Sequence, residues 1–230
     1  MARAKRLALA GELHHVLQRG HNRQTVFVDD TDCASYLAML RDAATEYGVA
    51  LHAYVLLATE VHLLVTPHES ISVSRLMQSM GRRYVTAFNR RHDRSGTLWE
   101  GRFRASVIEG ARVGIDAMLY VETLPVRLGQ ASGPGEWPWS SAGHHLGRRR
   151  DPVISEHPAY WALGNTPFER ELAHAHKLQE GVGPALAERF ERAVMQGRWV
   201  GSAPFAAAVA ARAGLQVQSR PRGRPRRVVA

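Results

Sequence analysis

Hydrophobic and polar positions follow a regular pattern over the first half of the chain. Residues 13–19 have the composition of a strand that ends at Gly20. In residues 29–47, a run of N-cap residues precedes apolar side chains at steps of three and four, which predicts a helix. Residues 49–58 and 61–66 are two β-prone apolar runs separated by two residues, which predicts an antiparallel pair of strands.

The pattern continues to about residue 125. Residues 72–88 predict a helix capped by Ser72 or Ser74. Residues 102–109 alternate as a strand does, and residues 113–123 predict a helix that Pro125 ends. The order strand, helix, strand, strand, helix, strand, helix predicts an α+β fold, with an antiparallel sheet and helices packed on it.

The remaining chain divides by composition. Residues 1–130 form the first predicted domain, and residues 131–157 read as a linker and irregular segment rich in glycine and proline. Residues 158–215 predict a helical C-terminal extension whose core includes Leu172, Phe190, Val194 and Phe205. Residues 216–230 predict a disordered basic tail. In the extension, His174 and His176 are expected at the surface. In the irregular segment before it, His144, His145 and Arg148–Arg150 are candidates for DNA contact.

Charge points to an anionic partner. The 230 residues carry 30 Lys and Arg against 21 Asp and Glu, a net charge of +9. This excess favours nucleic acid or an acidic membrane surface. Five arginines in residues 218–227 account for +5 of it, so the rest of the chain is only mildly basic.

Composition excludes several classes of protein. An apolar share of 45% is that of a globular protein and excludes a mostly disordered chain. The single cysteine, Cys33, excludes an intrachain disulfide and a cysteine-rich zinc site. No stretch approaches the ~20 apolar residues that span a bilayer. We therefore expect a soluble cytoplasmic protein with no membrane partner.

Two groups of residues are candidates for chemistry. Glu60 and His62 stand two apart in a predicted strand, so both side chains leave the same face and can converge on one metal ion or phosphate. The alternative is an ordinary polar face of the strand. Tyr120 is a candidate covalent nucleophile, with Asp116 one helical turn before it. The alternative interpretation of Tyr120 is a half-buried core tyrosine.

Residues 81–104 interleave arginines with aromatic residues. Cations neutralise phosphates and rings stack on unpaired bases, so this segment favours a nucleic-acid surface. Residues 220–225, Arg-Pro-Arg-Gly-Arg-Pro, resemble an AT-hook, which enters the minor groove of A·T-rich DNA. The alternatives are a solvated helix face and a nonspecific basic tail. The candidate DNA-binding residues are Arg19, Arg23, Arg82, Arg83, Arg90, Arg91, Trp99, Arg102, Arg104, Arg222 and Arg224.

Several ordered stretches resemble one family. They are residues 15–27, 54–57 with 61–67, 88–92, 96–103, 120–122 with 125–127, and 137–141. Together they resemble the REP-associated tyrosine transposases, a branch of the single-strand HUH transposases of insertion sequence 200 type. The resemblance implies a ferredoxin-like sheet, a divalent metal (Mg or Mn), a single-stranded or hairpin DNA partner, and a place at the bacterial nucleoid.

Position by position, the resemblance implies roles and reveals two departures. Tyr120 falls on the family's nucleophile, and His62 falls on the second histidine of its histidine-hydrophobic-histidine pair. Glu60 stands where the first histidine is expected, and Leu124 stands where the family has Asn or Gln as a metal ligand. Asp116 is the candidate substitute for that third ligand.

Two functions follow from the resemblance, and a third from charge. The first is tyrosine-mediated cleavage and strand transfer of single-stranded DNA, in transposition, by Tyr120, Glu60, His62 and a divalent ion. The second is a catalytically impaired module that recognises hairpin or repeat DNA. The third, RNA binding, is compatible with the charge alone.

Overall fold

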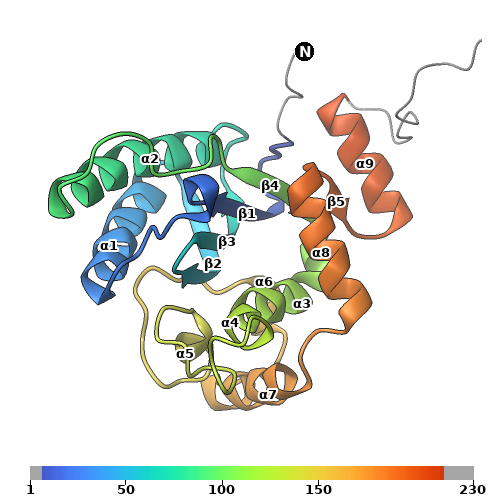
Figure 1. The fold of residues 1–230 in the computed structure, drawn as a ribbon. Helices are drawn as coiled ribbons and strands as arrows, with labels where there is room; N and C mark the ends of the chain where they lie inside the picture. Colours follow the sequence, from blue (N-terminus) through green and yellow to red (C-terminus); the bar gives the residue numbers. More distant parts are fainter. Residues whose placement is uncertain (1–6, 215–230) are drawn as a thin grey trace, which may run out of the picture.

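A five-stranded sheet forms the centre of the protein (Figure 1). The computed structural model describes residues 7–214. The strands lie in the order β2-β3-β1-β4-β5. Pairs β2-β3, β3-β1 and β1-β4 are antiparallel, as predicted, and the short β5 adds to β4 in parallel. The bounds are Leu13–Arg19 for β1, Val49–Leu57 for β2, Glu60–Pro67 for β3, Arg104–Ile108 for β4 and Trp199–Val200 for β5.

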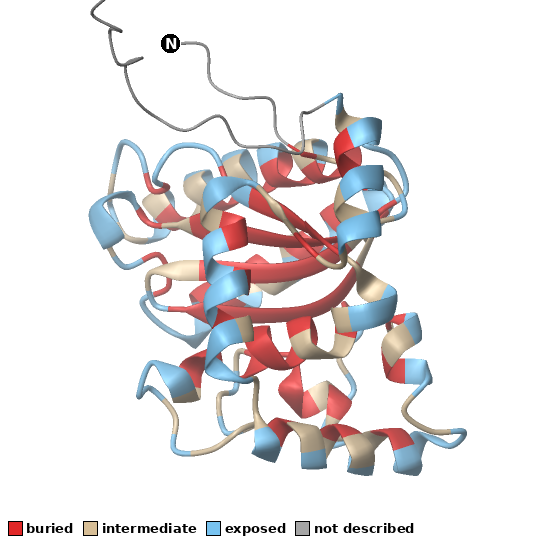
Figure 2. Ribbon diagram, turned by 90° about the vertical axis from the view of Figure 1, so that its right-hand side faces the viewer, coloured by how far each residue is buried: buried red, intermediate tan, exposed pale blue. Residues whose placement is uncertain are grey.

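Helices cover both faces of the sheet. On one face, α1 (Asp30–Glu46) and α2 (Ser72–Arg91) enclose one hydrophobic core. On the other, α3 (Gly110–Glu122) and α8 (Pro184–Gln196) enclose a second core. Figure 2 shows the strands as a buried layer between helices whose outward sides are exposed. The other helices are η1 (His21–Arg23), α4 (Leu124–Arg127), α5 (Ala142–His145), α6 (Pro158–Trp161), α7 (Pro167–Glu180) and α9 (Ala203–Ala213).

Apart from the short η1, the first seven elements and their order confirm the predicted α+β fold, and the strand order β2-β3-β1-β4 is that of a ferredoxin-like sheet. Local chemistry explains some of the boundaries. The Asp29 carboxylate accepts hydrogen bonds from the backbone N–H groups of Thr31 and Asp32, which caps α1. The predicted serine cap of α2 is wrong: Ile71 holds the N-cap position, and the Ser72 hydroxyl accepts from the Glu69 N–H outside the helix.

Residues 131–157 contain the short helix α5 and pack against the sheet. The Leu56 N–H donates to the Trp139 carbonyl (2.9 Å), and the Trp137 indole donates to the Leu56 carbonyl (2.9 Å). These bonds satisfy backbone groups along the outer edge of β2, which would otherwise be an open edge strand. The domain boundaries at 130 and 158 stay predictions.

The helical extension is present, with a core that differs from the predicted one. Phe190 and Val194 are buried, as predicted. Leu172 was predicted as core and is 60% exposed, because the buried side of α7 carries Arg170, His174 and Leu178. Within residues 7–214, no helix is long and apolar enough to cross a membrane. The AT-hook-like residues Arg222 and Arg224 lie outside the described residues.

Candidate functional site

The antiparallel pairing of β1 with β3 brings four polar side chains together. Arg19 lies opposite Glu60, and residues two apart on a strand share a face. The Arg19 guanidinium Nε donates to Glu60 Oε2 at 2.6 Å, and His62 Nε2 lies 3.0 Å from Glu60 Oε1. On its other side, His62 Nδ1 lies 2.9 Å from His15 Nε2. The predicted convergence of Glu60 and His62 is therefore present, within a chain of contacts that runs from Arg19 to His15.

Electrostatics fixes the charge states at the two ends of this chain of contacts. Burial by itself would raise the pKa of Glu60, but hydrogen bonds from His62 and Arg19 outweigh it and lower the pKa to about 2. Complete burial, followed by the proximity of His62, lowers the pKa of His15 well below its usual range. Glu60 is therefore a carboxylate and His15 a neutral imidazole at neutral pH.

Tyr120 lies on α3 next to His15, and it is only 2% exposed. The ring centroids of Tyr120 and His15 are 5.6 Å apart, edge to face. Phe190 of α8 covers the tyrosine ring at 5.2 Å, and the Arg127 guanidinium lies over it at 4.4 Å. Burial raises the pKa of Tyr120, and Arg127 opposes that rise. The tyrosine is thus beside the polar chain of contacts but shielded from solvent.

The residues present do not fit the metal site that the family resemblance implies. A cationic guanidinium already occupies the Glu60 carboxylate. Leu124 is 4% exposed within the apolar core and offers no ligand atom. Within residues 7–214, no third His, Cys, Asp or Glu, Asp116 included, joins Glu60 and His62 in a group of converging ligand atoms.

The candidate DNA-binding arginines fall into two groups. In the described part of the chain, Arg23, Arg82, Arg90 and Arg102 are exposed and form no ion pair. The others have protein partners: Arg19 pairs with Glu60, Arg83 with Asp42, Arg91 with Asp29 and Asp32, and Arg104 donates to the Met195 carbonyl.

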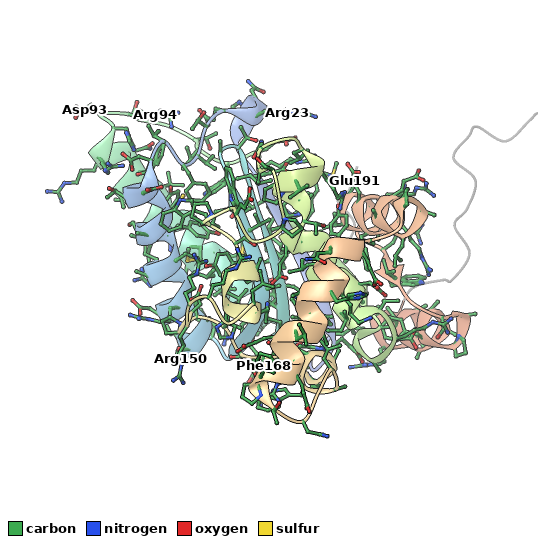
Figure 3. All side chains as sticks on the ribbon, turned by 90° about the horizontal axis from the view of Figure 1, so that it is seen from below. Arg23, Asp93, Arg94, Arg150, Phe168 and Glu191 are labelled. Carbon is green, nitrogen blue, oxygen red and sulfur yellow. The ribbon has the colours of Figure 1, made fainter. Side chains whose placement is uncertain are left out.

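Some of these arginines lie at the end of the sheet where Glu60 begins β3. The Gly20 N–H donates to the Thr59 carbonyl, and the Glu100 N–H donates to the Arg19 carbonyl. The loop after β1 and the loop before β4 are therefore adjacent. Arg94 donates to Gln24 Oε1 at 2.7 Å, and Figure 3 shows Arg94 and Arg23 toward the same edge of the molecule.

The aromatic residues of segment 81–104 are core residues rather than a surface. Tyr84, Phe88, Trp99 and Phe103 are at least nine-tenths buried. Trp99 and Phe103 also line a pocket of about 660 Å³ between α2 and residues 96–103. None of these four rings is therefore exposed for bases to stack on, contrary to the expectation from the sequence. The alternating apolar positions that carry the rings face the core.

Sequence reasoning missed several residues of the site. His15 and Arg127 lay inside or near the family-like stretches, but their contacts depend on strand register and helix packing. The covering Phe190 is 70 residues after Tyr120. The expectations for His174 at the surface and His145 in contact with DNA were wrong, since both are fully buried. His176, expected at the surface, is exposed.

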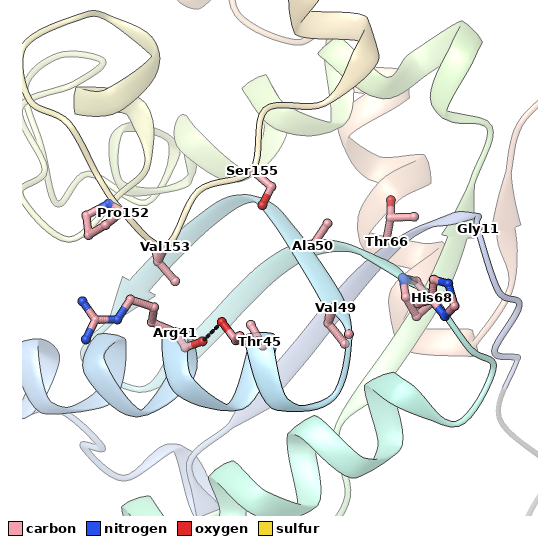
Figure 4. Close-up of a pocket in the computed structure, with 13 residues that line it drawn as sticks. Gly11, Arg41, Thr45, Val49, Ala50, Thr66, His68, Pro152, Val153 and Ser155 are labelled. Carbon is pink, nitrogen blue, oxygen red and sulfur yellow. Dashed lines mark hydrogen bonds between the residues drawn. The ribbon is translucent and has the colours of Figure 1, made fainter.

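A second hollow lies at the far end of β2 and β3. It has a volume of about 620 Å³ and is lined by residues that include Arg41, Val49, His68 and Ser155 (Figure 4). In it, the Thr45 hydroxyl donates to the Arg41 carbonyl of its own helix (3.1 Å). None of the predicted site residues lines this hollow, so it is separate from the tyrosine site.

Comparison with known proteins agrees with the fold. Residues 11–123 match the family described as IS200-like transposases. A solved structure of a REP-associated tyrosine transposase bound to a REP hairpin is similar, with a TM-score of 0.53 and 18% identity over 68% of this chain and 92% of that one. A candidate transposase from Deinococcus radiodurans R1 shares 28% identity over 50% of this chain and 94% of that one, with a TM-score of 0.36. None of the curated proteins compared matches significantly. Through residues 11–123, which hold all the strands of the ferredoxin-like sheet and the tyrosine helix, this chain belongs to the IS200-like transposases.

Proposed function

We propose that this chain binds single-stranded or hairpin DNA and that its tyrosine site, as folded, does not cut by the family's metal-assisted route. The proposal goes beyond the general DNA-binding and transposition function of the family. The ion pair between Arg19 and Glu60, at 2.6 Å, carries it. That pair places a positively charged side chain on the one carboxylate that stands in the family's ligand position.

DNA binding is supported by the distribution of positive charge. Arg23 and Arg102 are exposed, and neither forms an ion pair in residues 7–214. Arg23 lies in the loop after β1 and Arg102 in the loop before β4, and these loops are adjacent beside Arg19. Arginines without a protein partner neutralise phosphates without first losing an ion pair. The similar fold of a transposase bound to a REP hairpin supports a hairpin as the form of DNA, and the REP-associated branch as the affiliation.

Impaired cleavage is supported by three features together. Glu60 is already neutralised by Arg19, Leu124 lacks a lone pair, and Tyr120 is covered by Phe190. Each feature raises the cost of placing a phosphate against the tyrosine oxygen. Misplacement of reacting groups by ~1 Å can cost about 10²-fold in rate.

A binding and cleavage assay on the full chain tests the proposal. A labelled DNA hairpin with a single-stranded 5′ extension is titrated with protein, with EDTA, Mg or Mn present, and binding is read by fluorescence anisotropy. We expect the same affinity in all three buffers and for Tyr120→Phe, with no covalent adduct on a denaturing gel. Equal or tighter binding of the matching RNA hairpin would contradict DNA as the partner.

Tyrosine-mediated cleavage is the second candidate, favoured by the retention of Tyr120 beside His15 and Arg127. In it, the Tyr120 oxygen forms a bond to phosphorus while the bond from phosphorus to the 3′ oxygen breaks. The phenol proton leaves the tyrosine, and the departing 3′ oxygen gains a proton to become a hydroxyl. Phe190 and α8 must first move to admit the strand. An adduct in Mn that disappears in Tyr120→Phe would establish this candidate and overturn the first.

A further inference from the structure

A second polar cluster, independent of the proposed function, lies on the other side of the tyrosine helix. Glu122 of α3, His145 of α5 and His174 of α7 have completely buried side chains. His145 Nδ1 lies 2.6 Å from Glu122 Oε1, and His174 Nε2 lies 2.7 Å from Glu122 Oε2. One ligand atom from each residue lies within 4.8 Å of the other two.

The cluster lacks an obvious positive charge. In the described residues, Glu122 forms no ion pair with arginine or lysine; its only ionisable partners are the two imidazoles. Burial alone would raise the pKa of Glu122, but the two histidines hold it well below its usual range. A buried carboxylate needs a compensating cation, either a proton on one imidazole or a metal ion.

Each of the two imidazoles contacts the Glu122 carboxylate through one ring nitrogen. Their other nitrogens, His145 Nε2 and His174 Nδ1, are buried and have no hydrogen-bond partner in the described chain. The Ser141 hydroxyl donates to Glu122 Oε1 at 2.6 Å and orients the carboxylate from outside the group. Such outer contacts are typical of metal-binding carboxylates.

We propose that Glu122, His145 and His174 form a structural zinc site. Two imidazole nitrogens and one carboxylate oxygen form a ligand set that zinc uses, whereas Mg prefers oxygen ligands alone. Ligand distances of about 2.0–2.1 Å require the two contacts to Glu122 to lengthen by roughly 0.5–1 Å. Three protein ligands leave the fourth position of a tetrahedral zinc ion for a water molecule.

The site assigns a role to the helical extension. Glu122 is the last residue of α3 and stands two residues after Tyr120, while His174 lies in the middle of α7. A zinc ion there ties the tyrosine helix to the extension and to the short helix α5. Glu122, His145 and His174 are separate from Glu60 and His62, so failure of the DNA-binding proposal leaves this one standing.

Metal content of the untagged full chain is the first test. Protein is dialysed against zinc and then against metal-free buffer, and zinc is measured by mass spectrometry. We expect about one zinc per chain, lost in His145→Gln and His174→Gln. The matched control His176→Gln alters a histidine that is 73% exposed on the same helix, and it should keep the zinc. Glu60→Gln should also keep it.

Cobalt gives a second measurement that does not rely on variants. The wild-type chain with Co(II) should show the visible absorption of a four-coordinate site with nitrogen and oxygen ligands, and zinc should displace it. Removal of zinc by a chelator should lower the melting temperature by several degrees, and zinc should restore it. Wild-type protein with less than about a tenth of a zinc per chain and no cobalt spectrum would overturn the proposal and leave a metal-free hydrogen-bonded triad.

Discussion

Among single residues, His14 has a protonation state that its hydrogen bonds define. Its Nε2 accepts from the Leu9 N–H (3.2 Å), so its Nδ1, 2.7 Å from the Glu12 carbonyl, must carry the proton. Burial lowers the pKa of His14 to about 4, although its contacts with Glu12 raise the pKa. The low pKa agrees with a neutral ring. A second proton on Nε2 would face the Leu9 N–H and break that bond.

The first prediction is that His14 makes the fold sensitive to acid. The pKa is 6.5 when unfolded and about 4 when folded, so its contribution is complete above pH 6.5 and is lost as pH falls toward 4. It amounts to about 3 kcal/mol of the free energy of unfolding. Urea unfolding at several pH values should show a shallower fall for His14→Gln, and the exposed His176→Gln should follow the wild type.

The departures at Glu60 and Leu124 lead to a second prediction. Glu60→His with Leu124→Gln restores the ligand types of the family, and it removes the carboxylate that Arg19 holds. We expect Mn-dependent formation of a covalent DNA adduct that the wild type does not form. The buried amide that replaces the Leu124 side chain would cost about 1–3 kcal/mol of stability. The adduct must vanish when Tyr120→Phe is added; an adduct that persists without Tyr120 would contradict the prediction.

For the elements, the sequence was a good guide wherever the signal was local. Alternation and three-to-four spacing gave the strands and helices of residues 13–123, because each element buries one face. Partners distant in sequence were invisible: the contact of Arg19 with Glu60 depends on register, and the cover of Tyr120 by Phe190 depends on how α8 returns to the sheet. His174 looked like a surface residue because its partner Glu122 is 52 residues away.

Helix α8 gives the third prediction, since Phe190 is fully buried against Tyr120. Phe190→Ala should lower the free energy of unfolding by about 3–5 kcal/mol. It should also lower the pKa of Tyr120 toward its usual value by admitting water. An ultraviolet titration of the variant with and without Tyr120→Phe isolates that tyrosine.

Two further variants separate exposure of Tyr120 from loss of the fold. Phe190→Leu keeps most of the apolar volume and should give a smaller change in the same direction. Phe168→Ala alters a ring that is 70% exposed on α7 and labelled in Figure 3, so its stability should change by less than about 0.5 kcal/mol. An unchanged pKa of Tyr120 in a folded Phe190 variant would show that α8 does not shield it.

Over the whole molecule, the net charge of +9 is a poor measure of DNA affinity. Five of those charges lie in residues 218–227, and several arginines of the folded part already neutralise carboxylates, as Arg91 does for Asp29 and Asp32. An ion-paired arginine must lose its carboxylate partner before it binds a phosphate, whereas an unpaired arginine binds a phosphate without that loss. Position and pairing should therefore decide affinity more than the total charge.

The last prediction separates these two accounts. Arg102→Gln and Arg192→Gln each remove one positive charge, but Arg102 is unpaired in the described chain and Arg192 is paired with Glu188 on the outer side of α8. Dissociation constants for a single-stranded extension are measured at several salt concentrations. Arg102→Gln should weaken binding and lower the slope of log affinity against log salt by about 0.7, one single-strand phosphate contact. Arg192→Gln should leave the slope unchanged, because the removed side chain contacts Glu188 and not a phosphate. Equal effects of the two variants would mean that net charge alone attracts the DNA.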